Sequence, residues 1–315
     1  MSLIEQAAQR LEQLRQAGVD IPSTSPVETV SEPIVEQAPP PVRPEELPPP
    51  AKQDEMVVLQ SPEMVMSRRV ELDLEMLSAA GIIRPDSPRS QLADEYRVIK
   101  RPLIDNAMGK GASPIKDGNL IMVTSAMPGE GKTFTAANLA MSIAMELDNT
   151  VMLVDADVAR PALLKRLGLP QARGLLDVLV DESVKLPHVL LRTNVEKLTI
   201  LPSGTSHPRA TELLASDAMV RLLEEMASRY ADRIIIFDSP PLLVTTEART
   251  LASHMGQVVV VVRAESATHA DIKSALATLK ACPVKLMLLN QAKSTVQDGY
   301  GYGYGYGYGY GYGSK

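Results

Sequence analysis

Residues 124–133 (TSAMPGEGKT) combine glycines, a lysine and hydroxyl side chains in a spacing that suits phosphate binding. The segment follows an apolar run and precedes residues with helical spacing, which is the setting of a phosphate-binding loop. Gly129 and Gly131 would let backbone amides turn toward phosphate oxygens, aided by the partial positive charge at a helix start. Lys132 would reach the β- and γ-phosphates, and the Thr133 hydroxyl would bind Mg²⁺. The segment therefore predicts a nucleotide site.

Two later segments supply carboxylates for such a site. Asp155 and Asp157 lie in 151–161 (VMLVDADVARP), and Asp238 lies in 233–241 (RIIIFDSPP). Each follows an apolar run typical of a strand, and ligands of open α/β sheets bind beyond the carboxyl ends of the strands. Carboxylates beside a phosphate loop suit Mg²⁺ coordination or the acceptance of a hydroxyl proton. The alternative role for Asp157 and Asp238 is the capping of a following helix.

Tyrosine is concentrated at the end of the chain. Trp is absent, Phe occurs twice, and seven of the nine tyrosines lie within the last sixteen residues, where Gly and Tyr alternate over 299–313. We expect 298–315 to be a disordered tail, in which glycine at every second position lets each hydroxyl reach an active site. The other interpretation is a low-complexity tract that self-associates. The candidate phosphate acceptors are Tyr300, Tyr302, Tyr304, Tyr306, Tyr308, Tyr310 and Tyr312.

Short apolar runs alternate with helical spacing from residue 119 onward. Continuous Val and Ile runs indicate strands buried on both faces, which favours a parallel sheet between helices. We therefore predict an α/β domain over 106–297, with a P-loop NTPase-like, mostly parallel sheet and helices on both faces. The expected strands are 120–124, 151–154, 198–201, 234–237, 258–262 and 285–289, and the expected helices include 133–147, 210–229 and 268–282.

The residues before this domain divide by composition. Residues 1–18 carry apolar side chains at helical spacing and predict an amphipathic docking helix, which packs either on its own domain or on a partner. Its mixture of Arg and Glu favours a protein partner over lipid. Ten of the 24 prolines fall in 19–54, which predicts an extended linker. Residues 55–105 are predicted as a helical flank, with helices at 67–77 and 90–103.

The overall composition argues against several classes of protein. A net charge of −6 disfavours a nucleic-acid binder that works through bulk electrostatics. Cys282 is the single cysteine, so no disulfide can form within the chain, which fits a reducing compartment. The longest apolar run, 258–262, is far shorter than the ~18 residues that span a bilayer. We expect a soluble, cytoplasmic chain.

The segments GEGKT, LVDADVARP and IIIFDSPP, together with the tyrosine-rich end, resemble the bacterial tyrosine kinases of the polysaccharide co-polymerase family. The resemblance covers roughly 90–315 and includes LPSG at 201–204 and ELL at 212–214. The N-terminal helix, the proline linker and YRVIKRPL are similar, more narrowly, to the autokinases associated with exosortase-type exopolysaccharide loci. The resemblance implies ATP and Mg²⁺ as cofactors and autophosphorylation of the tyrosine cluster.

The resemblance also implies roles for individual residues. Lys132 and Thr133 match the Walker A ligands of phosphate and Mg²⁺. Asp155 and Asp157 match the Walker A′ pair, which binds Mg²⁺ and activates the tyrosine hydroxyl, and Asp238 matches the Walker B aspartate. Asp94, Arg97 and Lys100 occupy the E-x-x-R-x-x-R positions that join subunits into a ring. The residues expected to bind nucleotide are Pro128, Gly129, Glu130, Gly131, Lys132, Thr133 and Phe134, with Arg263 and Asn290 as adenine contacts.

Two positions depart from the family pattern. Ala126 replaces the first glycine of G-x-x-x-x-G-K-[ST]. Ala159 stands where the family usually has Arg in D-x-D-x-R, and the adjacent Arg160 would point elsewhere on a helix. Because Lys is a poorer bidentate partner than Arg, Lys100 is a further weak match to the ring motif.

The resemblance implies partners as well. These are a membrane chain-length-determinant (polysaccharide co-polymerase) protein as activator, further copies of the chain and a tyrosine phosphatase, with no nucleic acid. The chain would associate peripherally with the inner membrane through the activator. The competing interpretation is a ParA/MinD-like nucleotide-switched ATPase, which usually carries a signature lysine where this chain has Met127. The third interpretation is a non-enzymatic scaffold that binds nucleotide only in order to assemble.

Overall fold

The computed structural model describes residues 67–86, 90–111 and 113–293, all of which belong to one compact unit. The predicted docking helix at 1–18, the linker at 19–54 and the tail at 298–315 lie outside the described residues. None of the described helices is long and apolar enough to cross a membrane.

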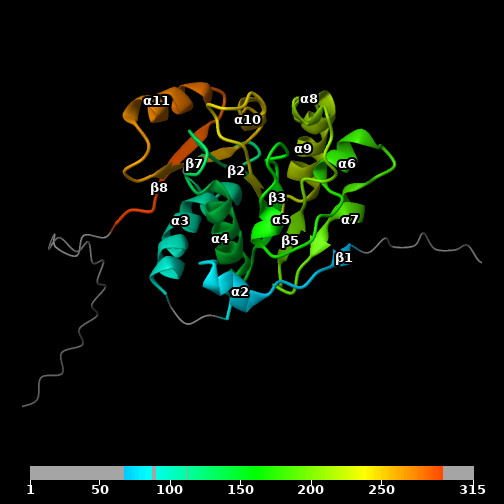
Figure 1. Ribbon diagram of the computed structural model, residues 1–315, viewed down its shortest axis with the longest axis horizontal. Coiled ribbons are helices and arrows are strands. Elements are labelled where there is room, and N and C mark those ends of the chain that lie inside the picture. Colours follow the sequence, from blue (N-terminus) through cyan, green and yellow to red (C-terminus); the bar gives the residue numbers. More distant parts are fainter. Residues whose placement is uncertain (1–66, 87–89, 112, 294–315) are drawn as a thin grey trace, which may run out of the picture. The chain divides into compact units, whose positions relative to one another are not determined.

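A sheet of eight strands forms the centre of this unit, in the order β1-β4-β5-β3-β6-β2-β7-β8 (Figure 1). All neighbouring strands are parallel except β4 and β5. The apolar runs form the central strands β2, β3, β6 and β7, which are buried almost throughout. The strands are β1 (Arg68–Arg69), β2 (Leu120–Ser125), β3 (Thr150–Asp155), β4 (Leu191–Arg192), β5 (Leu198–Leu201), β6 (Arg233–Asp238), β7 (Gln257–Arg263) and β8 (Val284–Asn290).

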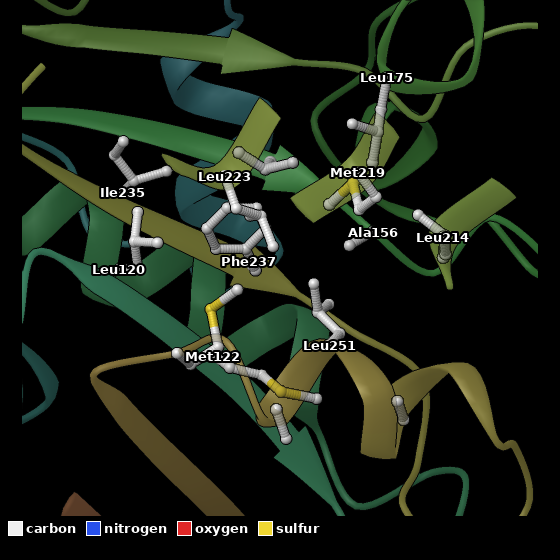
Figure 2. Packing of buried hydrophobic residues seen from close by; sticks show 14 of the residues in the cluster. Leu120, Met122, Ala156, Leu175, Leu214, Met219, Leu223, Ile235, Phe237 and Leu251 are labelled. Carbon is white, nitrogen blue, oxygen red and sulfur yellow. The ribbon is translucent and has the colours of Figure 1, made fainter. Parts of the chain in front are cut away.

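Helices cover both faces of the sheet. Successive strand residues point to opposite faces, and the central strands are apolar at nearly every position, so both faces must be buried. Ile121 and Val123 of β2 belong to a core formed with α2, α3, α4 and α5. Leu120 and Met122 belong to the core on the other face, formed with α6 to α11 (Figure 2). The helices are α2 (Leu74–Ala79), α3 (Gln91–Ala107), α4 (Lys132–Ala144), α5 (Leu163–Arg166), α6 (Leu175–Val180), α7 (Leu186–Val189), α8 (Ala210–Leu214), α9 (Asp217–Arg229), α10 (Glu247–Ala252) and α11 (His269–Thr278).

The architecture confirms the predicted fold class, and each of the six expected strands is present with its ends shifted by at most one residue. The prediction misses β1 and β4, which are two residues long. It also joins α8 and α9, which are separated where the Ser216 hydroxyl caps α9 by accepting a hydrogen bond from the Met219 amide at 3.3 Å.

The helix predicted at 67–77 is wrong. Arg68–Arg69 instead pairs with β4, and the Val70 amide donates to the Arg192 carbonyl at 2.8 Å. The helix begins only after Asp73, whose carboxylate caps α2 by accepting from the amides of Glu75 and Met76. A cap of this kind satisfies amides that have no partner within the helix.

Helices α2 and α3 pack on the same core as the sheet, although both precede residue 106. Leu77 of α2 and Leu103 of α3 are fully buried beside Ile121 and the α4 residues. The predicted boundary between residues 105 and 106 therefore does not separate two hydrophobic cores. It falls within α3, which packs on the same core as the sheet.

Candidate functional site

The phosphate loop lies between β2 and α4, where the sequence places it. Gly129 and Gly131 have φ values of 83° and 99°, a region that side chains with a Cβ rarely adopt. A Cβ atom at Gly131 would lie 2.1 Å from the Asn290 Nδ2 atom, whereas Gly129 has open space around it. Pro128 and Gly129 are exposed at the top of the loop. The loop is thus held closely on one side and open on the other.

Two residues predicted as nucleotide contacts hold the loop itself. The Glu130 side chain is buried, and its carboxylate accepts from the Met127 amide at 2.7 Å and the Arg263 amide at 3.4 Å. The Asn290 Nδ2 atom, at the end of β8, donates to the Glu130 carbonyl at 2.9 Å. The side chains of Glu130 and Asn290 are therefore used to shape the loop, and the Arg263 side chain lies exposed at the end of β7.

Phe134 also has a structural role. Its ring lies against Gly81, the turn that follows α2, and packs on the core beneath α4. The ring borders the pocket beside the loop as well, so the predicted nucleotide contact is compatible with this position.

The three aspartates meet at one end of the sheet. Asp155 and Asp238 end the neighbouring parallel strands β3 and β6 and are register partners. Asp157 follows two residues later, and its carboxylate lies 3.3 Å from the Lys132 Nζ atom at the start of α4. All three carboxylates are buried. The fold thus brings four of the predicted site residues together from three separate segments.

Burial controls the electrostatics of these carboxylates. It raises the pKa of Asp155 to about 8, with the neighbouring Asp238 adding to the effect. Burial likewise raises the pKa of Asp238 to about 7, although the Lys132 ammonium acts in the opposite direction. Acids that are perturbed in this way are often found at functional sites.

The aspartates have unused hydrogen-bonding capacity. Within the part of the chain that the structure describes, Asp155 Oδ1 and both carboxylate oxygens of Asp238 are buried without a hydrogen-bond partner. The capping alternative therefore fails for Asp238. Asp157 does support a turn, because its Oδ1 atom accepts from the Arg160 amide at 3.3 Å. Buried acceptors are rarely left unpaired, so they indicate an absent ligand.

These orphaned oxygens fit a hard divalent cation such as Mg²⁺. Mg²⁺ prefers oxygen ligands and is usually held by one or two carboxylates together with substrate phosphates. No group of three or more His, Cys, Asp or Glu side chains within 67–86, 90–111 and 113–293 is arranged to hold a metal by itself. The donor set of Asp155, Asp238 and the Thr133 hydroxyl therefore suits a cation that is shared with phosphate oxygens.

A pocket of about 690 Å³ adjoins the phosphate loop, which is within the usual volume of small-molecule sites. It lies between the loop, helix α3 and the end of β8. Arg166 of α5 is a lining residue that sequence reasoning missed. The sequence feature that could have identified Arg166 is its position shortly after the segment that carries Asp155 and Asp157. The lining residues are Leu92, Glu95, Tyr96, Ile99, Gly129, Gly131, Lys132, Thr133, Phe134, Arg166, Leu288, Leu289, Asn290, Gln291 and Ala292.

The residues predicted to join subunits do not share one environment. Asp94 and Arg97 form an ion pair on the exposed side of α3. Lys100 is 4% exposed, its Nζ atom lies 2.7 Å from the Glu146 carboxylate, and it donates to the Ser142 carbonyl at 2.5 Å. Lys100 thus departs from the expectation, because its ammonium is engaged by its own chain just after α4.

We expect Lys100→Ala to lower the free energy of unfolding by about 2–3 kcal/mol, since it removes a buried ammonium and leaves the partly buried Glu146 carboxylate without that partner. Arg101→Ala is the matched control. Its guanidinium lies 3.4 Å from the same carboxylate but is exposed, so a loss below about 1 kcal/mol is expected. Denaturant unfolding measures both. If Lys100→Ala left the unfolding midpoint unchanged but gave a smaller oligomer, the result would support the predicted role of Lys100 in joining subunits.

Comparison with known proteins agrees with this geometry. The family model described as an AAA domain matches residues 118–290. Tyrosine-protein kinase YwqD of Bacillus subtilis (strain 168) is 34% identical over 203 residues, which cover 64% of this chain and 81% of YwqD. Tyrosine-protein kinase wzc of Salmonella typhimurium is 30% identical over 174 residues, which cover 55% of this chain and 24% of wzc.

Comparison with solved structures also finds a similar protein. The crystal structure of the chimerical protein CapA2B2 superimposes with a TM-score of 0.56 at 26% identity, covering 70% of this chain and 93% of that one. These relatives favour the tyrosine-kinase interpretation over the ParA/MinD-like ATPase. With its AAA domain, its parallel sheet and its loop of phosphate-binding type, the chain belongs to the family of bacterial tyrosine-protein kinases.

Proposed function

We propose that this kinase transfers the γ-phosphoryl group of Mg-ATP to tyrosines of its own C-terminal tail. The observation that carries the proposal is the set of buried, unpaired carboxylate oxygens of Asp155 and Asp238 beside Lys132 and Thr133. Such a set suits a divalent cation that is shared with phosphate oxygens. Lys132 would hold the β- and γ-phosphates, and Thr133, Asp155, Asp157 and Asp238 would hold Mg²⁺, which when bound neutralises phosphate charge.

In the proposed step the tyrosine oxygen forms a bond to the γ-phosphorus. The bond from that phosphorus to the oxygen bridging the β- and γ-phosphates breaks, and ADP leaves. The hydroxyl proton passes to the Asp155–Asp157 carboxylate pair, which lies at the carboxyl end of β3. The chain contributes positioning and charge neutralisation, because phosphoryl transfer requires little covalent chemistry from the protein.

The tyrosines inside the described residues are poor acceptors. Tyr96 is 4% exposed, and burial raises the pKa of its hydroxyl to about 12. The Tyr230 ring lies 5.0 Å from the Arg233 guanidinium on the other face of the sheet. The seven tail tyrosines are therefore the candidates that the proposal favours, although they lie outside the described residues. Each phosphate would add about −1.5 to −2 charges to the tail.

The proposal extends to partners. The family resemblance supports a membrane co-polymerase protein as activator, a role in exopolysaccharide polymerisation and export, and a tyrosine phosphatase that reverses the modification. Self-association would use the exposed face of α3, where Asp94 and Arg97 remain accessible. Charge repulsion between phosphorylated tails would then loosen the assembly.

The tail is tested by changing all seven tail tyrosines to Phe. We expect the phosphotyrosine signal of the pure full-length chain with Mg-ATP to fall at least ~10-fold, because the acceptors are lost while the site is intact. Tyr230→Phe is the matched control and should leave the signal unchanged. A tail variant that keeps the signal would place the substrate elsewhere. A wild type that is silent, even with the cytoplasmic end of an activating membrane protein, would refute the kinase proposal.

A further inference from the structure

Arg166 is the last residue of the short helix α5, which the fold attaches directly to the carboxylate cluster. The Leu163 amide at the start of α5 donates to Asp155 Oδ2 at 3.3 Å. Leu163, Leu164 and Leu167 are buried in the core beneath the sheet. These contacts hold the helix on one side and leave Arg166 on the other, exposed to solvent.

The Arg166 side chain lines the pocket beside the phosphate loop, together with Gly129, Gly131, Lys132 and Thr133. Within the described ranges no hydrogen bond or ion pair engages its guanidinium group. A cation that is held at the mouth of a phosphate site without a protein partner is available to a ligand.

The charge balance of the site indicates what that ligand is. Asp155, Asp157 and Asp238 converge at the strand ends, and Lys132 already lies 3.3 Å from Asp157. A nucleoside triphosphate adds further negative charge there. Guanidinium groups bind phosphate oxygens in a bidentate manner, with planar geometry that an ammonium group lacks.

We propose that Arg166 binds the γ-phosphate of the nucleotide and so distinguishes ATP from ADP. The γ-phosphate is the favoured contact because Arg166 shares the pocket with Lys132 and Thr133, the two residues proposed to hold the terminal phosphates and the cation. This inference rests on the proposed kinase function and adds a phosphate-binding residue to it. The residue comes from α5 rather than from the phosphate loop.

The test compares Arg166→Ala and Arg166→Gln with Lys165→Ala in the full-length chain. Lys165 is the preceding residue of the same helix, is also exposed and does not line the pocket. Fluorescent ATP and ADP analogues are titrated with Mg²⁺, and phosphotyrosine formation is followed in parallel. We expect both Arg166 variants to bind the ATP analogue ~10-fold more weakly and to change ADP affinity less than ~2-fold. Their initial phosphorylation rate should fall ~10²-fold or more.

Two further variants sharpen the result. Arg166→Lys keeps the charge without the planar fork and should recover part of the ATP preference but not the full rate. Lys165→Ala should match the wild type in both assays. Equal thermal midpoints for all variants show that they are folded, which is expected because Arg166 is exposed.

Several outcomes would overturn the proposal. These are an unchanged ATP-to-ADP affinity ratio in both Arg166→Ala and Arg166→Gln, an equal loss of both nucleotides, or the same defect in Lys165→Ala. The proposed function can fail separately. A wild type that makes no phosphotyrosine, yet loses ATP preference when Arg166 is replaced, would refute the kinase step while the phosphate contact stands.

Discussion

Lys132→Met should reduce phosphotyrosine formation on the order of 10³-fold, because the phosphate loop would lose the side chain that is proposed to hold the β- and γ-phosphates. Methionine keeps nearly the same length and volume without the charge. In the free protein Lys132 also faces the Asp157 carboxylate at 3.3 Å, and both side chains are about nine-tenths buried. The substitution therefore removes a phosphate ligand and leaves a buried carboxylate without its partner.

The two consequences can be separated experimentally. Initial rates with radiolabelled ATP report phosphoryl transfer, and thermal unfolding of the same sample reports the cost of the unpaired Asp157. Lys116→Met is the control, since Lys116 is 92% exposed in a loop and should change neither quantity. If Lys132→Met kept even a tenth of the wild-type rate, the loop lysine would not be the phosphate ligand and the site would need another cation.

The strands and the loop could be predicted from sequence because their signals are local. Continuous apolar runs mark β2, β3, β6 and β7, and the glycine pattern marks the turn before α4. The meeting of Asp155 with Asp238 was expected only in outline, from the rule that ligands bind at strand ends. Their pairing depends on β3 lying beside β6, and strand order is a property of the whole fold.

Sequence reasoning missed the features that depend on tertiary contacts. Glu130 was predicted to bind nucleotide, and the structure adds that its carboxylate closes the loop by accepting from two backbone amides. Asn290 lies 160 positions along the chain from the Glu130 carbonyl that it contacts, so no local pattern reveals the pairing.

The burial of Lys100 was missed for a different reason, because a usable signal was present. Tyr96, Lys100 and Ile104 are spaced four apart, which places all three on one face of α3, and all three are buried. The charge of Lys100, considered alone, favoured an exposed position for its side chain. The partner that makes burial tolerable, Glu146, lies beyond the end of another helix and could be identified only from the fold.

A second large effect is expected for Asp238→Asn, which should stabilise the nucleotide-free protein while it abolishes phosphoryl transfer. Burial raises the pKa of Asp238 to about 7 in the folded chain, against about 3.9 in an unfolded one. A carboxyl group of this kind contributes stability when it is protonated. That contribution is fully present below about pH 4 and is lost as the pH rises through 7. Asp155, with a pKa raised to about 8, acts in the same direction.

The free energy of unfolding of the wild type should therefore fall between about pH 4 and pH 8 when nucleotide and Mg²⁺ are absent. The amide side chain introduced by Asp238→Asn is neutral throughout this range, so the variant should lose less. The gap between the two proteins should widen with pH to roughly 2–4 kcal/mol at pH 8. Denaturant titrations at pH 5, 6.5 and 8 measure it. Asp232→Asn, at an exposed position, is the control and should follow the wild type.

Mg-ADP should reverse the order of stability of the wild type and Asp238→Asn. Mg-ADP stabilises whichever form binds it, in proportion to the logarithm of ligand concentration over its dissociation constant. The wild type keeps the Asp238 oxygens for the cation and should gain stability, whereas Asp238→Asn should gain little. Equal stabilisation of both proteins by Mg-ADP would mean that the unpaired oxygens of Asp238 are not held for a metal ion. A wild-type stability that does not change from pH 5 to pH 8 would contradict the raised pKa values of Asp238 and Asp155.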